Sequence, residues 1–287
     1  MMAHLSPIPE GQVRRSEFDH RWNRLDSRWN ADTEIRRYVH RAKVERICAQ
    51  LQPGKTLLDV CRGGSVDGVT GVQAAKRGLD VTILNPSEIG LKVIRKFASQ
   101  EDVEDRINFV QSDPLSIEFP DRSFDVVVSS HVLEHLSDFN RGLSEVRRVT
   151  RHSAIVALPT CTNPAVLCRL GGGDPYNFSL RSLLLTFKGS GLAVRAWRQG
   201  EDGVDEDMSE LGEMIVHRWR FPGHMRRHLE QAGFEITRFE PDSVVLPWFT
   251  KLFPVTCWLD NHGQLPVIRD LGMGSHAFVI RNDAVGH

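Results

Sequence analysis

The chain has 287 residues, of which 40% are hydrophobic and 25% charged, with a formal net charge of −1. This length and apolar content suit one large α/β domain or two small ones. The balanced charge predicts no general attraction to nucleic acid or anionic lipid, although a local basic stripe stays open. The sequence shows neither a run of about 18 apolar residues nor a secretory leader, so we expect no membrane partner.

The five cysteines are scattered along the chain without paired spacing. Such a distribution is typical of reduced thiols in a cytoplasmic protein. No CxxC pair indicates zinc, and we expect no metal site.

An amphipathic helical pattern covers residues 14–50, with Trp22, Leu25 and Trp29 at helical spacing. We interpret it mainly as a helical element that packs on the rest of the fold. A lid that brings aromatic side chains over a pocket is the alternative.

From Lys55 onward, short apolar runs alternate with helix-like segments. Ser87 is a plausible N-cap for the second of these helices. The predicted strands are 55–60, 80–84, 106–113, 123–130 and 153–160, with helices at 66–78, 87–100 and 131–150 between them. Alternation at this spacing predicts a doubly wound, mostly parallel α/β sheet.

Residues 159–221 interrupt the alternation. They contain an apolar, helix-like run at 180–187 and an acidic run at 200–210, which we expect to be a solvated loop. The chain then returns to a helix and two strands. We therefore divide it into an N-terminal helical cap (1–51), an α/β core (52–158), a substrate-side insertion (159–221) and a C-terminal completion of the core (222–287).

Four predicted strands end in polar or small residues. In open parallel sheets, ligands bind at the carboxyl ends of the strands, near the point where strand order reverses. We expect these ends to form one site. They are Asp59 to Ser65, Asn85 with Pro86, Asp113 with Pro114, and Ser129 to His131.

With these strand ends, the chain resembles the class I S-adenosylmethionine-dependent methyltransferases of the small-molecule type. The resemblance runs from about Lys55 to Pro159 and resumes with "RRHLEQAGFEI" and the last strand. Its most specific stretch is "FPDRSFDVVVSSHVLEHLSDFNRGLSEVRRV". It implies a seven-stranded Rossmann-like sheet with an antiparallel last strand, S-adenosylmethionine as cofactor and a small-molecule partner. A homodimer stays open.

The family's first strand ends in an acid followed by a GxGxG-type loop. Asp59 matches the acid and Gly63 the middle glycine, while Cys61 and Ser65 stand at the outer glycine positions. A cysteine would be strained there if position 61 required a positive φ.

The other matches lie on the following strands. Asn85 stands where the family usually has the acid that binds the ribose hydroxyls. Asp113, followed by Pro114, matches the residue that accepts a hydrogen bond from the adenine amino group. Ser130 and His131 match the residues that line the bottom of the cofactor site, where the methionine part binds.

Two hypotheses follow from this partial match. In the first, the loop is atypical but functional, and the protein methylates a small organic acceptor on oxygen or nitrogen. In the second, the fold is retained but cofactor use is lost or altered, and the protein is a binding or scaffolding partner or a non-methylating enzyme. Fold alone does not decide between them.

His131 is the first candidate for a general base, because it follows strand four and its ordinary pKa of about 6.5 suits proton transfer near neutrality. Tyr176 and His217 are weaker candidates. His131, Glu134 and His135 also spell HxxEH, a zinc-protease pattern that we consider a coincidence here. Apolar residues of the insertion are expected to wall the acceptor: Leu167, Leu170, Phe178, Phe187, Trp197 and Trp219.

Overall fold

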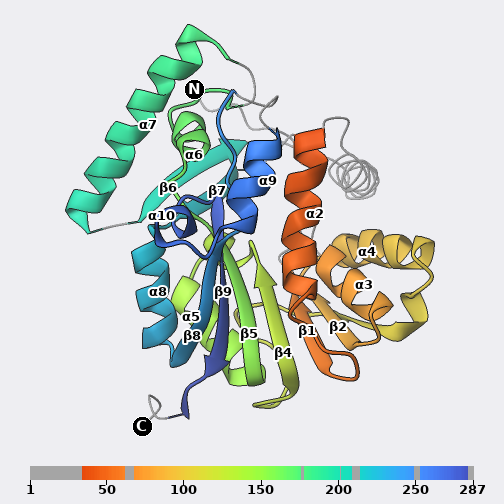
Figure 1. The fold of residues 1–287 in the computed structure, drawn as a ribbon. Helices are drawn as coiled ribbons and strands as arrows, with labels where there is room; N and C mark the ends of the chain where they lie inside the picture. Colours follow the sequence, from red (N-terminus) through yellow and green to blue (C-terminus); the bar gives the residue numbers. More distant parts are fainter. Residues whose placement is uncertain are drawn as a thin grey trace, which may run out of the picture.

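A seven-stranded sheet forms the centre of the computed structural model (Figure 1). The structure describes residues 34–61, 68–175, 178–200, 202–208, 214–248 and 253–283, with the backbone alone at 34–40, 204–208, 214–217 and 253. The strand order is β3-β2-β1-β4-β5-β9-β8, and only β9 runs antiparallel to its neighbours. The predicted doubly wound sheet is confirmed. Its strands are β1 (Thr56–Val60), β2 (Asp80–Asn85), β3 (Ile107–Gln111), β4 (Phe124–Ser130), β5 (Thr150–Pro159), β8 (Phe234–Pro241) and β9 (Gly274–Arg281).

Helices cover both faces of the sheet because neighbouring strand residues point to opposite sides. Leu57 packs with helices α2 (Glu34–Cys48), α3 (Val69–Lys76) and α4 (Glu88–Gln100). Leu58 packs with α5 (Phe139–Val149) and α8 (Pro222–Gln231) on the other face. Both faces of the strands are therefore buried, as the continuous apolar runs predict.

The segment after β4 differs from the prediction of one helix over 131–150. A short 3-10 turn, η2 (Leu133–His135), comes first, and α5 begins only at Phe139. Asp138 is extended, and its carboxylate accepts a hydrogen bond from the Arg141 amide at 3.0 Å. This N-cap satisfies a free amide of the first turn and fixes where α5 starts.

Between β5 and α8 lie α6 (Pro164–Leu170), α7 (Leu180–Gln199), and the antiparallel pair β6 (Gly203–Met208) and β7 (Met214–Trp219). The prediction of a solvated loop over 200–210 is wrong, because Gly203–Met208 pairs with β7 residue by residue. Backbone hydrogen bonds to a partner strand outweigh the poor strand propensity of acidic residues. The remaining short helices are η1 (Glu104–Arg106), α9 (Phe253–Asn261) and α10 (Pro266–Arg269).

Helices α6 and α7 pack closely through glycines. A Cβ built on Gly189 of α7 would lie 1.9 Å from the Leu167 carbonyl oxygen of α6, and one on Gly171 would lie 1.7 Å from the Leu185 oxygen. No side chain fits at such distances, so the contact requires glycine. Gly191, two residues further along α7, has nothing within 4 Å of such a Cβ.

Alanine substitutions at the two glycines of α7 should have opposite effects on stability. Gly191→Ala is expected to raise the free energy of unfolding by up to about 1 kcal/mol, because alanine favours an exposed helix. Gly189→Ala is expected to lower it by about 1–3 kcal/mol, because its methyl group displaces α6. Urea unfolding of both variants measures the difference, and equal effects would show that α6 and α7 do not pack as described.

Candidate active site

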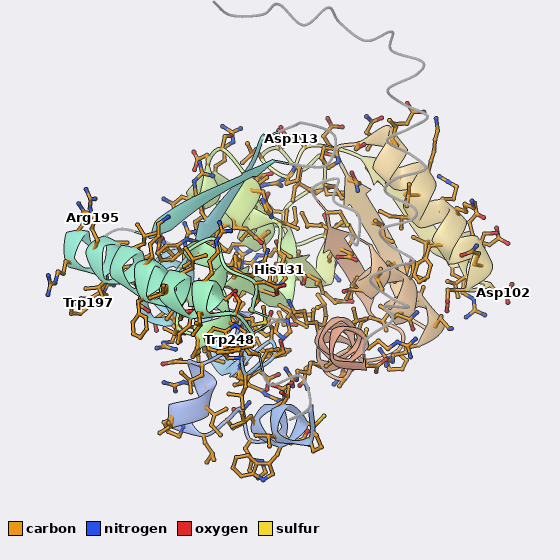
Figure 2. The ribbon with its side chains drawn as sticks, turned by 90° about the horizontal axis from the view of Figure 1, so that it is seen from above. Asp102, Asp113, His131, Arg195, Trp197 and Trp248 are labelled. Carbon is orange, nitrogen blue, oxygen red and sulfur yellow. The ribbon has the colours of Figure 1, made fainter. Side chains whose placement is uncertain are left out.

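The predicted strand ends meet at one edge of the sheet. Val60, the last residue of β1, pairs with Leu84 of β2 and with Ser129 of β4, while Asn85 pairs with Gln111 of β3. The carboxyl ends of four parallel strands are thus adjacent. Figure 2 views the molecule from above, with His131 near the middle and Asp113 toward the rim. Gly63 and Ser65 lie outside the described residues.

Asp59 and Cys61 lie on the face of the sheet that α2, α3 and α4 cover. Asp59 is 3% exposed, and its Oδ2 accepts a hydrogen bond from the Gly71 amide in α3 at 2.7 Å. Cys61 is buried among apolar side chains and is not among the described non-glycine residues with positive φ. The expected strain at Cys61 is therefore absent, and a glycine there has no strain to relieve.

Asn85 is fully buried at the end of β2. Its Oδ1 accepts a hydrogen bond from the Ser87 amide at 2.8 Å, and Ser87 in turn caps α4, as predicted, by accepting from the Gly90 amide. The Asn85 Nδ2 has no hydrogen-bond partner in the described chain. An unpaired buried amide is costly, and a ribose hydroxyl oxygen is a partner of the right chemistry.

Asp113 is exposed just beyond β3, and Pro114 beside it is buried. One carboxylate oxygen of Asp113 accepts from the Leu115 amide at 2.8 Å, which fixes the side chain in a turn. The other carboxylate oxygen can accept a hydrogen bond, and an adenine amino group is a donor that could supply it. Ser130 is partly exposed at the end of β4. These residues fit the predicted cofactor, and their roles stay predictions.

His131 lies between two buried carboxylates. Its Nδ1 is 3.4 Å from Glu134 Oε1, and its Nε2 is 3.5 Å from Asp242 Oδ2. The imidazole is 28% exposed, whereas Glu134 is 2% and Asp242 0% exposed. The backbone of His131 has φ 57°, in the left-handed region, where histidine is more frequent than most residues.

Asp242 follows β8 and receives a cation from α2. Lys43 Nζ lies 2.6 Å from Asp242 Oδ2 and 3.4 Å from His131 Nε2. Asp242 Oδ1 accepts from the amides of Ser243 and Gly274, at 2.6 and 2.7 Å. This carboxylate joins α2, the end of β8 and the start of β9.

Arg46, one turn after Lys43, makes the second tie from α2. Its NH2 lies 3.1 Å from Asp260 Oδ2 in α9, and its NH1 donates to the Pro241 carbonyl at 2.9 Å and to that of Asp242. Asp260 in turn accepts from the Val244 amide at 2.7 Å. Lys43 and Arg46 share a helix face because they are three residues apart.

The charges of this cluster shift its ionisation. Burial raises the pKa of Asp242, but Lys43 and His131 outweigh it and hold that pKa well below the ordinary 3.8. Burial and Lys43 lower the pKa of His131, yet Asp242 and Glu134 outweigh them, so the pKa lies above 6.5. Fully buried His276 in β9 has a pKa lowered to about 3, mainly by desolvation, and stays neutral.

Lys43, Asp242 and His276 were missed by the sequence analysis. The basic pair at i and i+3 in α2 and the Asp-Ser at the end of a late strand are weak signals, since neither shows which partner it meets. Tyr176 lies outside the described residues, and the side chain of His217 is not described.

The expected aromatic wall of the acceptor site is partly wrong. Trp219 is 5% exposed and packs with Leu167 and Leu170, but Phe178, Phe187 and Trp197 are 63%, 69% and 61% exposed. An amphipathic stripe does not reveal which side of it faces the fold, and here the aromatic side of α7 faces outward.

The HxxEH sequence adopts no continuous helix, because η2 covers only Leu133–His135 and His131 precedes it in a left-handed conformation. Glu134 Oε1 is 3.4 Å from His131 and 3.5 Å from His135. Among the described residues, no group of three or more His, Cys, Asp and Glu side chains is placed to hold a metal ion. Nor does the described part of the chain contain a helix long and apolar enough to cross a bilayer.

Comparison with known proteins agrees with this geometry. Residues 59–158 match the model of a methyltransferase domain. A sterol 24-C-methyltransferase of Gibberella zeae is 33% identical over 105 residues, which are 37% of this chain and 27% of that enzyme. A demethylmenaquinone methyltransferase of Listeria welshimeri is 25% identical over 215 residues, covering 74% of this chain and 84% of that one.

Among solved structures, an S-adenosylmethionine-dependent methyltransferase from Listeria monocytogenes, itself described as putative in its function, superposes with a TM-score of 0.56. It is 17% identical, covering 85% of this chain and 99% of that one. The chain spans only 27% to 47% of the length of three of the curated relatives, so their matches concern the shared domain alone.

The strand order and the site at the carboxyl edge define a Rossmann-like methyltransferase fold. Residues 59–158 match a methyltransferase-domain model, and the fold of the chain is similar to that of S-adenosylmethionine-dependent methyltransferases. Among the solved neighbours, a magnesium protoporphyrin IX methyltransferase from Synechocystis holds S-adenosylhomocysteine in one structure and S-adenosylmethionine in another.

Replacing Asp242 by asparagine should destabilise the fold strongly. Asn keeps the shape but removes the charge opposite Lys43, and breaking a buried pair costs about 3–5 kcal/mol. The full loss of stability should be present at pH 7, where Asp242 of the wild type is charged. The difference between the two proteins should shrink as the pH falls below 3.8 and through the lowered pKa of Asp242, because the wild type then loses the same charge.

Denaturant unfolding of wild type and Asp242→Asn across pH measures this difference. Asp121→Asn is the matched control, since Asp121 is 72% exposed and pairs with Arg148 at the surface. It should change stability by no more than about 0.5 kcal/mol. A pH-independent gap between wild type and Asp242→Asn would contradict the assigned ion pair.

Proposed function

We propose that the protein transfers a methyl group from S-adenosylmethionine to an oxygen or nitrogen atom of a small organic acceptor. The observation that carries the proposal is the set of strand-end residues, Asn85, Asp113 and His131, at the carboxyl edge of the sheet, where the resemblance leads us to expect the cofactor. The named activities of the two relatives, on a sterol and on demethylmenaquinone, support a small apolar acceptor.

The residues divide into binding and proton-transfer roles. Asp113 would accept from the adenine amino group and Asn85 Nδ2 would donate to a ribose hydroxyl, while Asp59 positions the first turn of α3 beside the loop. When bound, the cofactor supplies a methyl group on a positively charged sulfur. The chain then has to hold an acceptor in line with it, and this positioning provides much of the rate.

His131 is suited to remove a proton from a phenol, alcohol or ammonium acceptor. It is the partly exposed member of a cluster whose carboxylates are buried. Glu134 at Nδ1 orients the ring, as the third group of a catalytic triad does. Lys43, 3.4 Å from Nε2, and Asp242 set how readily that nitrogen takes a proton.

The opposing hypothesis, a fold with lost or altered cofactor use, rests on Cys61 and Ser65 in the glycine loop and on Asn85 replacing an acid. Neutral partners make hydrogen bonds of about 0.5–1.5 kcal/mol against about 1.5–3 for charged ones, so the change weakens binding without abolishing it. Calorimetric titration of the purified protein with S-adenosylmethionine and S-adenosylhomocysteine separates the hypotheses. Absence of heat with both ligands would favour the loss of cofactor use.

Asp113→Ala is expected to weaken S-adenosylmethionine binding by about 1–3 kcal/mol, because the adenine amino group loses its acceptor. Asp105→Ala is the matched control, since Asp105 is also exposed but precedes β3 instead of following it. The same titration measures both variants. Equal affinities of Asp113→Ala and wild type would refute the adenine assignment.

His131→Asn should lower the rate by about 100- to 10,000-fold for acceptors that must lose a proton. Asparagine tolerates the left-handed backbone of residue 131, so the fold should persist. The wild-type rate should rise with pH along a limb whose midpoint lies above 6.5, and the variant should lack that limb.

A panel of phenols and secondary amines, with S-adenosylhomocysteine release as the signal, provides this measurement. A tertiary amine, which has no proton to lose, is the control acceptor and should be methylated equally by both proteins. The same pH limb in His131→Asn would exclude His131 as the base.

A further inference from the structure

The outer face of α7 carries an apolar stripe that nothing in the described chain covers. Ser182, Gly189 and Ala193 form its buried side, against α6. The opposite side and Phe178, two residues before the helix, expose large apolar side chains, by 48% to 73%. They are Phe178, Leu180, Leu184, Phe187, Val194 and Trp197. Exposed apolar side chains grouped in this way mark an interaction surface.

Cations border this stripe. Arg181, Lys188 and Arg195 recur every seven residues beside Leu184 and Phe187, and Arg198 follows in the last turn. All four are exposed, and none forms an ion pair with a described residue. Residues 178–200 contain no Asp or Glu. The surface of α7 therefore combines apolar side chains with positive charge, and no residue of the helix itself offsets that charge.

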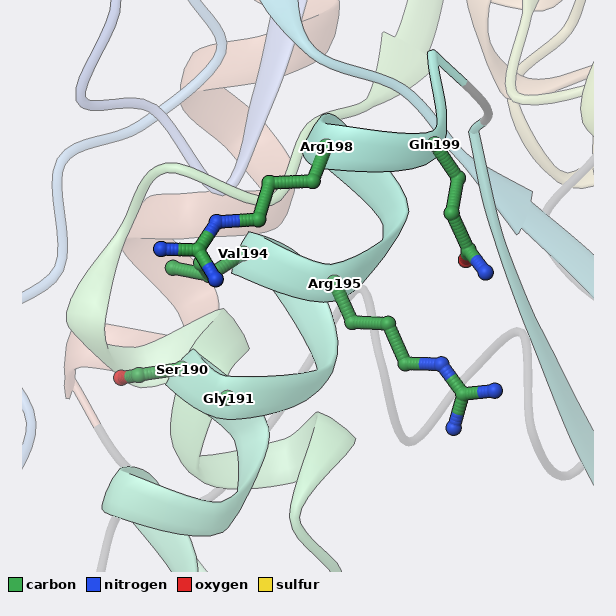
Figure 3. A pocket seen from close by; sticks show the side chains of 6 residues that line it. All are labelled: Ser190, Gly191, Val194, Arg195, Arg198 and Gln199. Carbon is green, nitrogen blue, oxygen red and sulfur yellow. The ribbon is translucent and has the colours of Figure 1, made fainter.

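Small residues also leave a hollow of about 510 Å³ on this helix, beside Arg195 and Arg198 (Figure 3). Ser190, Gly191, Val194 and Gln199 complete its lining. In Figure 3 the two arginine side chains extend away from the helix axis on different sides. The hollow is thus flanked by guanidinium groups that can bind phosphate oxygens.

We propose that α7 docks the protein on an anionic lipid bilayer surface, lying in the interface with Leu184 and Phe187 inserted. A helix of 20 residues is about 30 Å long, enough for several headgroups along its length. Leu, Phe and Trp on one side with Lys and Arg beside them are the composition of interfacial helices. The long cationic side chains reach past the apolar stripe to the phosphates.

A second copy of the chain is a poorer occupant of this face. Two α7 helices packed against each other would bring eight cations together, with no carboxylate in either segment to offset them. Like charges placed opposite one another disfavour such a contact. The docking is independent of the proposed methyl transfer, since it uses no residue of the candidate active site.

Vesicle sedimentation of the full chain tests the proposal. The probes are vesicles of phosphatidylcholine containing about one-third phosphatidylglycerol, and vesicles of phosphatidylcholine alone. Wild type should sediment with the anionic vesicles and at least tenfold more weakly with the neutral ones. Raised salt should weaken the anionic binding, because it screens the cations.

Two variants separate the two parts of the surface. Lys188→Glu with Arg195→Glu, and Leu184→Ser with Phe187→Ser, should each weaken anionic vesicle binding at least tenfold. Arg227→Glu, an exposed arginine of α8, is the charge control and should bind like wild type. Because all these side chains are exposed, thermal unfolding should be nearly unchanged and reports any variant that misfolds.

Three results would overturn the proposal. The first is no sedimentation of wild type with anionic vesicles, which would leave an acidic protein as the candidate partner. The second is an equal loss of binding in Arg227→Glu and the α7 variants. The third is a wild-type dimer in solution that Leu184→Ser with Phe187→Ser dissociates, without any vesicle binding.

Discussion

The ion pair between Lys43 and Asp242 is the contact on which the candidate active site depends. It joins α2, which precedes the sheet, to the end of β8, about 200 residues later in the chain, at 2.6 Å. Desolvating Asp242 is costly, and the lysine together with the Ser243 and Gly274 amides compensates for it. Without this carboxylate, Lys43 would face His131 as an unshielded cation.

The properties of His131 follow from that pair. Burial and Lys43 alone would lower the pKa of the His131 imidazole. The carboxylates of Asp242 and Glu134 reverse the direction of that shift. His276, close to the same charges but without a hydrogen-bond partner in the described chain, shows the other outcome, with a pKa of about 3. The pKa values of two histidines at one sheet edge are thus shifted in opposite directions, because only His131 lies against carboxylates.

Local patterns predicted the alternating strands and helices from β1 to β5, and the Ser87 cap, because these depend on neighbours in the sequence. Non-local contacts account for what was missed. The acidic run became β6 because β7 pairs with it, and Asp242 acquired its partner through the packing of α2. Strain was expected at Cys61 because the residue stands at a glycine position of the family's loop pattern. In the structure its side chain packs in the core beside α3.

Helix α7 shows why the direction of an amphipathic helix cannot be taken from its large side chains. The sequence offers two stripes, one of Leu, Phe and Val and one of Ser, Gly and Ala, and the second faces the fold. Close approach to the α6 backbone is possible only on the small side, where Gly189 lies against Leu167. The stripe of large apolar side chains therefore faces outward, because it does not fit against α6. A net charge of −1 averaged over 287 residues conceals that this one helix is purely cationic, so the overall balance and a local attraction to anionic lipid do not conflict.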